Sequence, residues 1–257
     1  MKRERILVEN RRNEILEELK QHGEIEVNQL AAKWNISPLT IRRDLQFLED
    51  QKKIVRFYGG AALAVPQAPE EDDITLYRRL IAQYAASLVE DRDSIFVNTS
   101  ITALQMVKYL GGKQVTVITN NGQIINMEVP PSVSAVLTGG EVRYPKHAMV
   151  GEFALRNLEH VSVKKCFMGC SGLSVERGMT TEIMNEVNIN RLMIQGAIGT
   201  TYILADHRKL GKNSSFVSCS VNHITHIITD ERADENVVSA FREKGIHVYQ
   251  VSKKDAD

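Results

Sequence analysis

The sequence predicts an α/β protein of two parts, an N-terminal winged helix-turn-helix followed by a Rossmann-like domain with a parallel sheet. Closely spaced short helical stretches, and then a strand-like run that ends in Gly59–Gly60, indicate the first part. Beyond residue 74, short apolar runs alternate with helical stretches, as in a doubly wound parallel sheet. We expect residues 1–62 to form the first domain, 63–73 a linker and 74–257 the second domain.

The composition allows a buried core in each part. The chain has 257 residues, of which 43% are hydrophobic, and no apolar run approaches the length of a membrane span. No signal peptide is recognised, so we expect a soluble cytoplasmic protein without membrane contact. The 32 basic and 32 acidic residues balance, and residues 1–60 hold 12 basic against 10 acidic side chains. Binding of nucleic acid by the first part would therefore depend on the placement of a few cations and on dimerisation.

Three helices are expected before residue 51. Arg11–Gln21 forms the first, with its apolar residues inward, and Gly23 ends it. Apolar residues at positions i, i+3, i+4 and i+7 of Val27–Trp34 predict the second helix. Ser37 is a favourable N-cap, and Pro38 occupies the first position of the third helix. The inward residues of that helix are Ile41, Leu45 and Leu48.

The outward face of the third helix carries residues suited to DNA. Two closely spaced helices, the second with small polar residues and a pair of arginines, match a helix that enters the major groove. Strand-forming residues around Arg56 and the turn at Gly59–Gly60 predict a β-wing that lies on phosphate. The alternative is a small helical bundle with solvated arginines. The candidate DNA-contacting residues are Ser37, Leu39, Thr40, Arg42, Arg43, Gln46, Arg56 and Tyr58.

Cysteine and histidine spacing gives no metal site. Cys166, Cys170 and Cys219 are three in number and form no repeated C-x-x-C motif, which favours small core residues of a reduced protein. His223 and His226 have a spacing that a metal could use, but no third ligand is near them in the sequence. We therefore expect neither a metal nor another cofactor.

The second part begins with a helix, Ile74–Val89, that has one apolar face. It either packs as ordinary core or connects the second domain to the first. The strands expected after it are Ser94–Val97, Val115–Thr119, Ser134–Leu137, Lys165–Met168, Tyr202–Leu204, Ile224–Thr229 and His247–Val251. The helices expected between them are Thr102–Leu110, Gln123–Glu128, Ala148–Leu158, Glu186–Ile198 and Asn236–Lys244.

Polar residues follow several of these strands. Ligands of doubly wound sheets bind at the carboxyl ends of the strands, and hydroxyl and N–H groups of residues 98–102 at a helix N-terminus suit a phosphate. Gly139–Gly140 allows close backbone approach, and Arg143 supplies a cation. The alternative for each position is an ordinary cap or turn. For a small phosphorylated molecule, the candidate binding residues are Asn98, Ser100, Ile101, Thr102, Asn120, Gly140, Arg143 and Lys209.

Motifs in both parts resemble the DeoR family of regulators. In the first part these are SPLTIRRDL and the R-x-x-GGA ending of the wing; in the second they are TNN, LTGGEVR, GMTTE, LADHRK and ITD. The resemblance extends over about Arg11 to Val251. It implies a regulator, usually a repressor, whose sensor domain is similar in fold to ribose-5-phosphate isomerase. It also implies a homo-oligomer that binds operator DNA and responds to a sugar phosphate or related metabolite.

The chain departs from the family pattern at several positions. D-x-G-T-T is replaced by residues 98–102, Asn-Thr-Ser-Ile-Thr, and G-A-D-G by residues 169–172, Gly-Cys-Ser-Gly. Asn190 stands at a position that is often lysine, and Tyr58 replaces a common histidine of the wing. Three of these changes remove charge from the expected pocket, which points to an unusual or weakly bound effector.

Two other kinds of protein would suit the second domain. A sugar-phosphate isomerase on the same fold needs a carboxylate base and a matched acid. Ser171 and Asn190 cannot serve in these roles, which leaves Glu141, Glu182 and Asp206. An interaction module without an effector is disfavoured by the polar strand ends. The sequence therefore favours a DNA-binding regulator over both alternatives.

Overall fold

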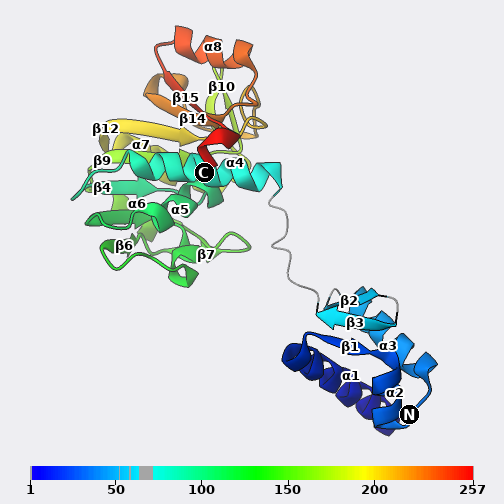
Figure 1. Ribbon diagram of the computed structural model, residues 1–257. Helices are drawn as coiled ribbons and strands as arrows, with labels where there is room; N and C mark the ends of the chain where they lie inside the picture. The colour runs from blue at the N-terminus through cyan, green and yellow to red at the C-terminus, as the bar shows by residue number, and fades with distance from the viewer. Residues whose placement is uncertain (1, 52, 58, 64–71, 257) are drawn as a thin grey trace. The chain divides into compact units, whose positions relative to one another are not determined.

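The computed structural model describes residues 2–51, 53–57, 59–63 and 72–256, and within this range side chains are described for 8–51, 53–57, 59–63 and 72–255. The chain divides into two compact units, Met1–Glu70 and Glu71–Asp257, each with its own hydrophobic core (Figure 1). The predicted combination of a helix-turn-helix unit and a parallel-sheet unit is confirmed. Most of the expected linker lies outside the described residues.

The first unit consists of three helices and a small sheet. The helices are α1 Lys2–His22, α2 Val27–Trp34 and α3 Pro38–Asp50, and the strands are β1 Glu24–Glu26, β2 Ile54–Phe57 and β3 Gly60–Leu63. Strand β3 lies between the other two and pairs antiparallel with both. Ile15, Leu19 and the predicted inward residues of α3 are buried in one core.

Three features of this unit differ from the sequence prediction. Helix α1 begins at Lys2 rather than Arg11. Residues 60–63 form a strand to which the sequence prediction assigned no range, and β1 was not predicted. Both strands are too short to show an alternating pattern, and each depends on its partner for backbone hydrogen bonds. Gly60 is required there, because a Cβ atom would lie 2.3 Å from the carbonyl oxygen of Ile25.

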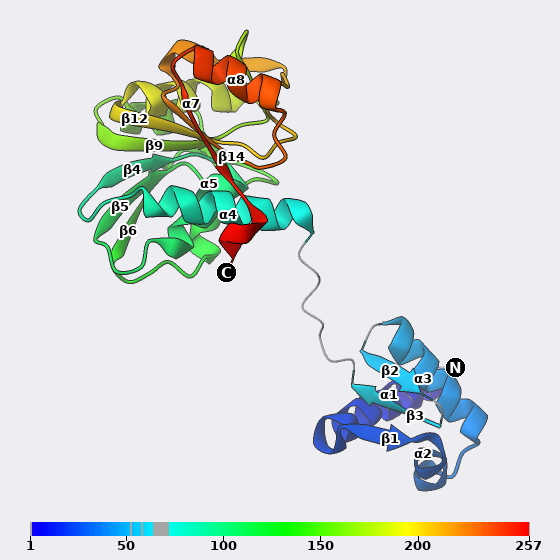
Figure 2. The same cartoon turned by 45° about the horizontal axis from the view of Figure 1, so that its top comes forward.

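The second unit is built on seven parallel strands in the order β15-β14-β12-β9-β4-β5-β6 (Figure 2). These strands are β4 Ser94–Val97, β5 Val115–Thr119, β6 Val133–Leu137, β9 Val163–Gly169, β12 Ala197–Leu204, β14 His226–Asp230 and β15 His247–Val251. The helices are α4 Asp73–Ser87, α5 Ile101–Gln105, α6 Glu152–Leu158, α7 Val187–Gln195 and α8 Glu235–Glu243. Short 3₁₀ turns are η1 Met106–Tyr109, η2 Gly122–Asn126, η3 Met184–Glu186, η4 Val221–His223 and η5 Lys253–Ala256.

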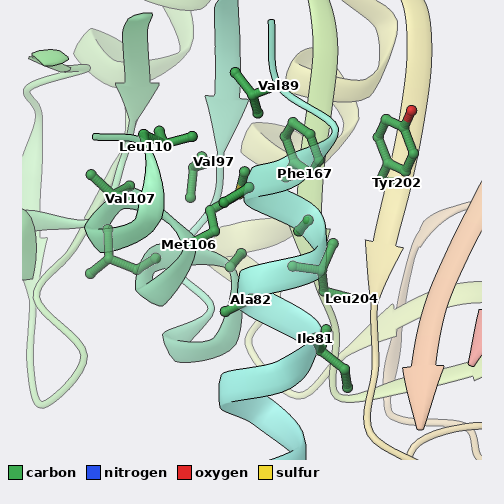
Figure 3. Packing of buried hydrophobic residues seen from close by; sticks show 14 of the residues in the cluster. Ile81, Ala82, Val89, Val97, Met106, Val107, Leu110, Phe167, Tyr202 and Leu204 are labelled. Atoms are coloured by element: carbon green, nitrogen blue, oxygen red, sulfur yellow. The ribbon is translucent and has the colours of Figure 1, made fainter. Parts of the chain in front are cut away.

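Both faces of this sheet are buried, as the near-continuous apolar strands predict. Successive side chains of a strand point to opposite faces. Thus Val97 and Phe167 pack with α4 and η1, whereas Phe96 and Met168 pack with α6, α7 and α8. Figure 3 shows Ile81 of α4 in the first of these clusters, together with side chains from β4, β9 and β12. Helix α4 therefore covers one face of the sheet, as ordinary core packing requires.

Five further strands lie outside the main sheet and were not predicted. Strands β7 Glu141–Arg143 and β8 Ala148–Val150 form a hairpin, and β10 Gly172–Ser174, β11 Gly178–Thr181 and β13 Phe216–Cys219 form a three-stranded sheet. Residues 148–150 are thus a strand, so the helix expected from Ala148 begins at Glu152. The helix expected over Glu186–Ile198 ends at Gln195, because the following residues enter β12. Residues 122–126 form a 3₁₀ turn rather than an α-helix.

Within the described part of the chain, no helix has both the length and the apolar character needed to cross a bilayer.

Candidate functional site

Helix α3 presents two free arginines on the surface of the first unit. The Ser37 side chain accepts a hydrogen bond from the backbone N–H of Thr40 at 3.2 Å, which fixes the start of the helix. Arg42 and Arg43 are exposed, and no hydrogen bond or ion pair links either guanidinium to another described residue. Leu39, on the same surface, is 57% exposed. These side chains are available to a partner in the way that groove-reading residues must be.

A different pair of arginines holds the buried carboxylate of this helix. The Nε of Arg11 lies 2.7 Å from one oxygen of Asp44, and the Nε of Arg12 lies 2.8 Å from the other. The guanidinium of Arg12 also lies over the ring of Phe47, 3.7 Å from its centre. Arg11 and Arg12 therefore fix α1 to α3, which leaves the arginines of α3 without this structural role.

Two other candidates contact each other within the unit. The Nε of Arg56 on β2 lies 2.8 Å from Oε2 of Glu49, and its Nη2 donates a hydrogen bond to Gln46. The amide nitrogen of Gln46 donates to Asp50 at 2.8 Å. Arg56 and Gln46 thus link the wing to α3 in this structure. Tyr58, the last candidate on this face, lies outside the described residues.

A cleft of about 270 Å³ opens in the second unit where β12, β9 and β4 end. In the sheet, β5 and β6 lie on one side of β4, and β9, β12, β14 and β15 lie on its other side. The direction in which the chain adds strands therefore reverses next to β4. The cleft therefore lies at the topological switch point, where doubly wound sheets bind ligands. Its lining residues are Arg78, Asn98, Thr99, Ser100, Ile101, Thr102, Lys146, Gly169, Cys170, Ser171, Thr181, Glu182, Glu186 and Lys209.

Three cations and two backbone N–H groups favour an anion in this cleft. Lys209 and Arg78 are partly buried and Lys146 is exposed, and the Lys209 ammonium forms no ion pair with any described residue. The N–H groups of Ile101 and Thr102, at the start of α5, have no hydrogen-bond acceptor among the described residues. Because α5 has only five residues, its dipole adds little, and the side-chain cations must supply most of the attraction.

A buried carboxylate also lines the cleft. Glu186 is 4% exposed and accepts hydrogen bonds from the hydroxyls of Thr99 at 2.8 Å and Thr181 at 3.0 Å. The ammonium of Lys146 lies 3.8 Å from the same carboxylate. An ionised carboxylate has about four acceptor positions, so acceptor capacity remains for donors of a ligand. The cleft therefore offers both cations and hydrogen-bond acceptors, and Lys146 lies beside the acceptor Glu186.

Asn98 is occupied by the protein itself. Its side chain donates to the carbonyl of Gly169 at 2.9 Å and accepts from the N–H of Gly169 at 2.9 Å. It also donates to Asn190 at 3.2 Å and is 2% exposed. Asn98 thus joins the ends of β4 and β9, which differs from the expected contact with sugar hydroxyls. Gly169 fits the same junction, because a Cβ atom there would lie 1.9 Å from Oγ of Ser100.

Of the other predicted residues, Ser100, Ile101, Thr102 and Lys209 line the cleft, whereas Asn120, Gly140 and Arg143 do not. The unpredicted β7–β8 hairpin lies at the end of β5, where Asn120 donates its side-chain N–H to Met149 at 3.1 Å. A Cβ atom at Gly140 would lie 2.5 Å from the carbonyl of Val150, so this glycine serves internal packing. Arg143 is exposed and forms an ion pair with Glu141 at 2.7 Å.

Four charged residues of the cleft were not among the predicted effector-binding residues, namely Arg78, Lys146, Glu182 and Glu186, and of these only Glu182 was considered, as a possible acid or base of an isomerase. Arg78 lies on the helix that precedes the first strand, and Lys146 lies on an unpredicted hairpin, so neither follows a strand end in the sequence. Glu186 carried one signal, since it follows shortly after the motif GMTTE of residues 178–182.

The cysteines are buried, as predicted, and all three are free thiols. Cys170 borders the cleft, and burial raises its pKa to about 11, although the charge of Lys209 acts in the opposite direction. This cysteine therefore stays protonated at neutral pH. His223 and His226 do not belong to any group of three or more possible metal ligands among the described residues.

A helix-turn-helix with free arginines, joined in one chain to a sheet with a charged cleft, defines the class of ligand-responsive DNA-binding regulators. Comparison with known proteins gives the particular family. Residues 11–67 match the DeoR-like helix-turn-helix domain, and residues 75–231 match the DeoR C-terminal sensor domain. The chain belongs to the DeoR family of transcriptional regulators, which confirms the prediction of a regulator rather than an enzyme.

Curated relatives match along almost their full length. An uncharacterised HTH-type transcriptional regulator of Bacillus subtilis, YulB, is 31% identical over 96% of this chain and 98% of the relative. The HTH-type transcriptional repressor GlcR of Bacillus subtilis is 30% identical over 91% of this chain and 93% of its own. The lactose phosphotransferase system repressor of Staphylococcus aureus is 29% identical over 88% of this chain and 94% of its own.

Solved structures are more distant. Ribose 5-phosphate isomerase A of Methanocaldococcus jannaschii aligns with a TM-score of 0.37 and 16% identity, over 54% of this chain and 55% of that chain. An eIF2B beta subunit of Chaetomium thermophilum aligns with a TM-score of 0.42 and 12% identity, over 72% of this chain and 56% of that chain. Similarities of this size say nothing about activity.

Proposed function

We propose that this regulator is a repressor of a carbohydrate-metabolism operon and that a small phosphorylated sugar or related metabolite, bound in the cleft, modulates its affinity for operator DNA. Relatives named as repressors, one of them a lactose phosphotransferase system repressor, support the regulated process. The main support for an anionic, phosphorylated ligand is that Lys209, Arg78 and Lys146 all line one cleft.

The shape and charge of the cleft fit such a molecule. Ligand pockets for drug-sized compounds measure roughly 300–1,000 Å³, and about 270 Å³ suits a smaller metabolite. A phosphate near Lys209, Ile101 and Thr102 would place sugar hydroxyls toward the acceptors of Glu186. We assign Ser100, Ile101, Thr102, Lys209, Arg78, Lys146 and Glu186 as the effector-contacting residues.

The DNA contacts of this proposal lie on α3 and the wing. Arg43 would contact a base edge, with Ser37, Leu39, Thr40 and Arg42 beside it at the groove and its phosphates. Gln46 and Arg56 would contact DNA after exchanging their present partners. Such a protein acts where operator DNA lies, which we take to be the cytoplasm.

Calorimetry with a panel of sugar phosphates tests the effector site. We expect at least one compound to bind the wild-type protein and to change its affinity for operator DNA in a fluorescence-anisotropy titration. The Lys209→Gln variant should bind that compound at least tenfold more weakly. Lys212→Gln is the matched control, because Lys212 is an exposed lysine outside the cleft and its replacement changes the net charge by the same amount. Equal weakening in both variants would contradict the assignment, and no binding by any compound would contradict the sensor role.

We further propose that the protein acts as a homodimer or larger homo-oligomer. The first 60 residues carry only a small positive excess, so tight binding to DNA requires two or more copies on repeated half-sites. Light scattering at micromolar concentration should give a mass of at least twice 28.9 kDa. A strict monomer that binds one half-site tightly would contradict this proposal.

A further inference from the structure

Arg78 is a residue of helix α4 whose side chain lines the cleft. Its Nε lies 3.3 Å from Oδ2 of Asp206, and 31% of its side chain is exposed along the cleft. Asp206 is buried just beyond the end of β12. The Arg78 guanidinium therefore lies between a buried carboxylate and the space available to a ligand.

Asp206 has enough other partners to release Arg78. The guanidinium of Arg208 donates to both carboxylate oxygens, at 3.0 and 3.3 Å, and the backbone N–H of Arg208 lies 3.3 Å from Oδ1. Burial opposes ionisation of Asp206, but the Arg208 hydrogen bond and the nearby cations outweigh it and lower its pKa. Loss of one guanidinium thus leaves the buried charge compensated, and the large penalty for an unpaired buried ion does not arise.

The first turn of α4 is held differently from the rest of the helix. Asp73 forms ion pairs at the surface, with Lys253 at 2.6 Å and with Arg232 at 3.4 Å. Pairs of this kind are individually weak. From Tyr77 onward, α4 buries one side chain after another in the core. Residues 73–75 are therefore the part of α4 that can rearrange without disrupting the core, because Leu76 packs against the core and Tyr77 is buried in it.

We propose that Arg78 couples the cleft to the DNA-binding unit: an anionic oxygen of the effector draws its guanidinium away from Asp206, and the first turn of α4 rearranges with it. A ligand shifts an equilibrium only through contacts that differ between the two states. A guanidinium that exchanges a protein carboxylate for a ligand anion is such a contact. The inference rests on the proposed function, because it requires an anionic effector that changes operator affinity.

The test compares Arg78→Gln with Arg208→Gln, which also removes a guanidinium from Asp206 but acts from the loop after β12. Operator affinity is measured by anisotropy, with and without glucose 6-phosphate, fructose 6-phosphate, ribose 5-phosphate or inorganic phosphate, and binding of the same probes by calorimetry. In Arg78→Gln we expect probe binding to weaken by no more than about tenfold, while the change in operator affinity at saturation falls to less than twofold. In Arg208→Gln and Arg78→Lys, the probe should still change operator affinity. The logarithm of that fold-change should be at least half of the wild-type value.

Hydrogen exchange gives a second readout. The N–H groups of Thr75 and Leu76 both donate to Asp72, at 2.7 and 3.0 Å, and report on the first turn. A probe that changes operator affinity should alter their exchange in the wild type and not in Arg78→Gln.

Each other outcome overturns the coupling role of Arg78. A full response in Arg78→Gln would show that the signal takes another route, and an equal loss in Arg208→Gln would make the charge balance of Asp206 responsible. Complete loss of probe binding in Arg78→Gln would reduce Arg78 to a simple ligand contact. If the wild type responds to none of the probes, the proposed sensor function fails as well, so that result is distinct from the others.

Discussion

The Nε of Arg56 lies 2.8 Å from Oε2 of Glu49, which ties the wing to α3 within the face proposed to contact DNA. The backbone N–H of Arg56 lies 3.2 Å from the other oxygen of Glu49. These hydrogen bonds hold the pKa of Glu49 below its usual value, so the carboxylate stays ionised at neutral pH. A phosphate that approaches the wing must therefore compete with Glu49 for Arg56.

The Glu49→Gln variant should bind DNA more tightly than the wild type. It removes the carboxylate that competes with phosphate for Arg56. We expect the slope of log affinity against log salt concentration to increase by about 1, as for one additional phosphate contact. Glu24→Gln, at an exposed position of β1, makes the same change in charge and is the control. Identical slopes for both variants would show that Arg56 is already free to bind DNA.

The Arg43→Ala variant should lose sequence discrimination. Arg43 is exposed on α3 without a protein partner among the described residues, and a bidentate contact from arginine to guanine contributes about 1–3 kcal/mol. We expect a loss of that size on the cognate site and a smaller loss on unrelated DNA, measured by anisotropy. Lys20→Ala, on α1, controls for the change in charge. Full operator affinity in a folded Arg42→Ala/Arg43→Ala double variant would rule out the assignment.

The Asp44→Asn variant should destabilise the first unit. It leaves the guanidinium groups of Arg11 and Arg12 partly buried without their carboxylate, and breaking a buried pair costs about 3–5 kcal/mol. Trp34 is the single tryptophan of the chain and lies in this unit, so its fluorescence follows urea unfolding of the unit within the full-length protein. Glu17→Gln, which removes an exposed partner of Lys20, should change the midpoint little. A comparable shift in both variants would contradict the structural role of Asp44.

The ion pair of Asp93 predicts a loss of stability in acid. Burial opposes ionisation of Asp93, but the hydrogen bond from Lys165 at 2.8 Å and other contacts outweigh it and lower its pKa from the ordinary 3.8. Its contribution to the free energy of unfolding is therefore complete above about pH 3.8 and is lost as pH falls through the lower folded-state pKa.

Urea unfolding of the second unit at pH 7 and pH 3 measures this effect, with far-UV circular dichroism as the signal. The wild type should lose more stability between the two pH values than Asp93→Asn, which has no carboxyl group to titrate there. An equal loss would show that the pair does not contribute to acid sensitivity.

The Gly169→Ala variant should damage the cleft by crowding Ser100. A Cβ atom at residue 169 would lie 1.9 Å from Oγ and 2.2 Å from Cβ of Ser100, so one strand end must move. Overpacking of this kind costs about 1–3 kcal/mol. We expect a lower urea midpoint and weaker effector binding in Gly169→Ala, and partial recovery of stability in Gly169→Ala/Ser100→Gly, which removes the atoms in conflict. No recovery in the double variant would place the conflict elsewhere.

The candidate cleft could be predicted only in part. Polar residues directly after a strand, such as Ser100 and Lys209, were found because strand ends can be read from the sequence and meet at one edge of a parallel sheet. The sequence did not show which strand ends are neighbours, so residues after β5 and β6 were assigned to the same site. In the structure the β7–β8 hairpin lies at the end of β5, and Asn120 binds that hairpin instead.

Local patterns in the sequence were sufficient to predict most helices and strands of this protein. Caps, apolar periodicity and strand composition placed α2, α3, α4 and the seven main strands, because each signal depends on residues a few positions apart. Which charged residues come together, in contrast, depends on the packing of distant segments. Arg78 and Lys209 lie 131 positions apart, and Arg11 and Asp44 lie 33 apart, yet each pair shares one site. Strand order and helix packing set such contacts, and both depend on burial of the whole core rather than on neighbouring residues.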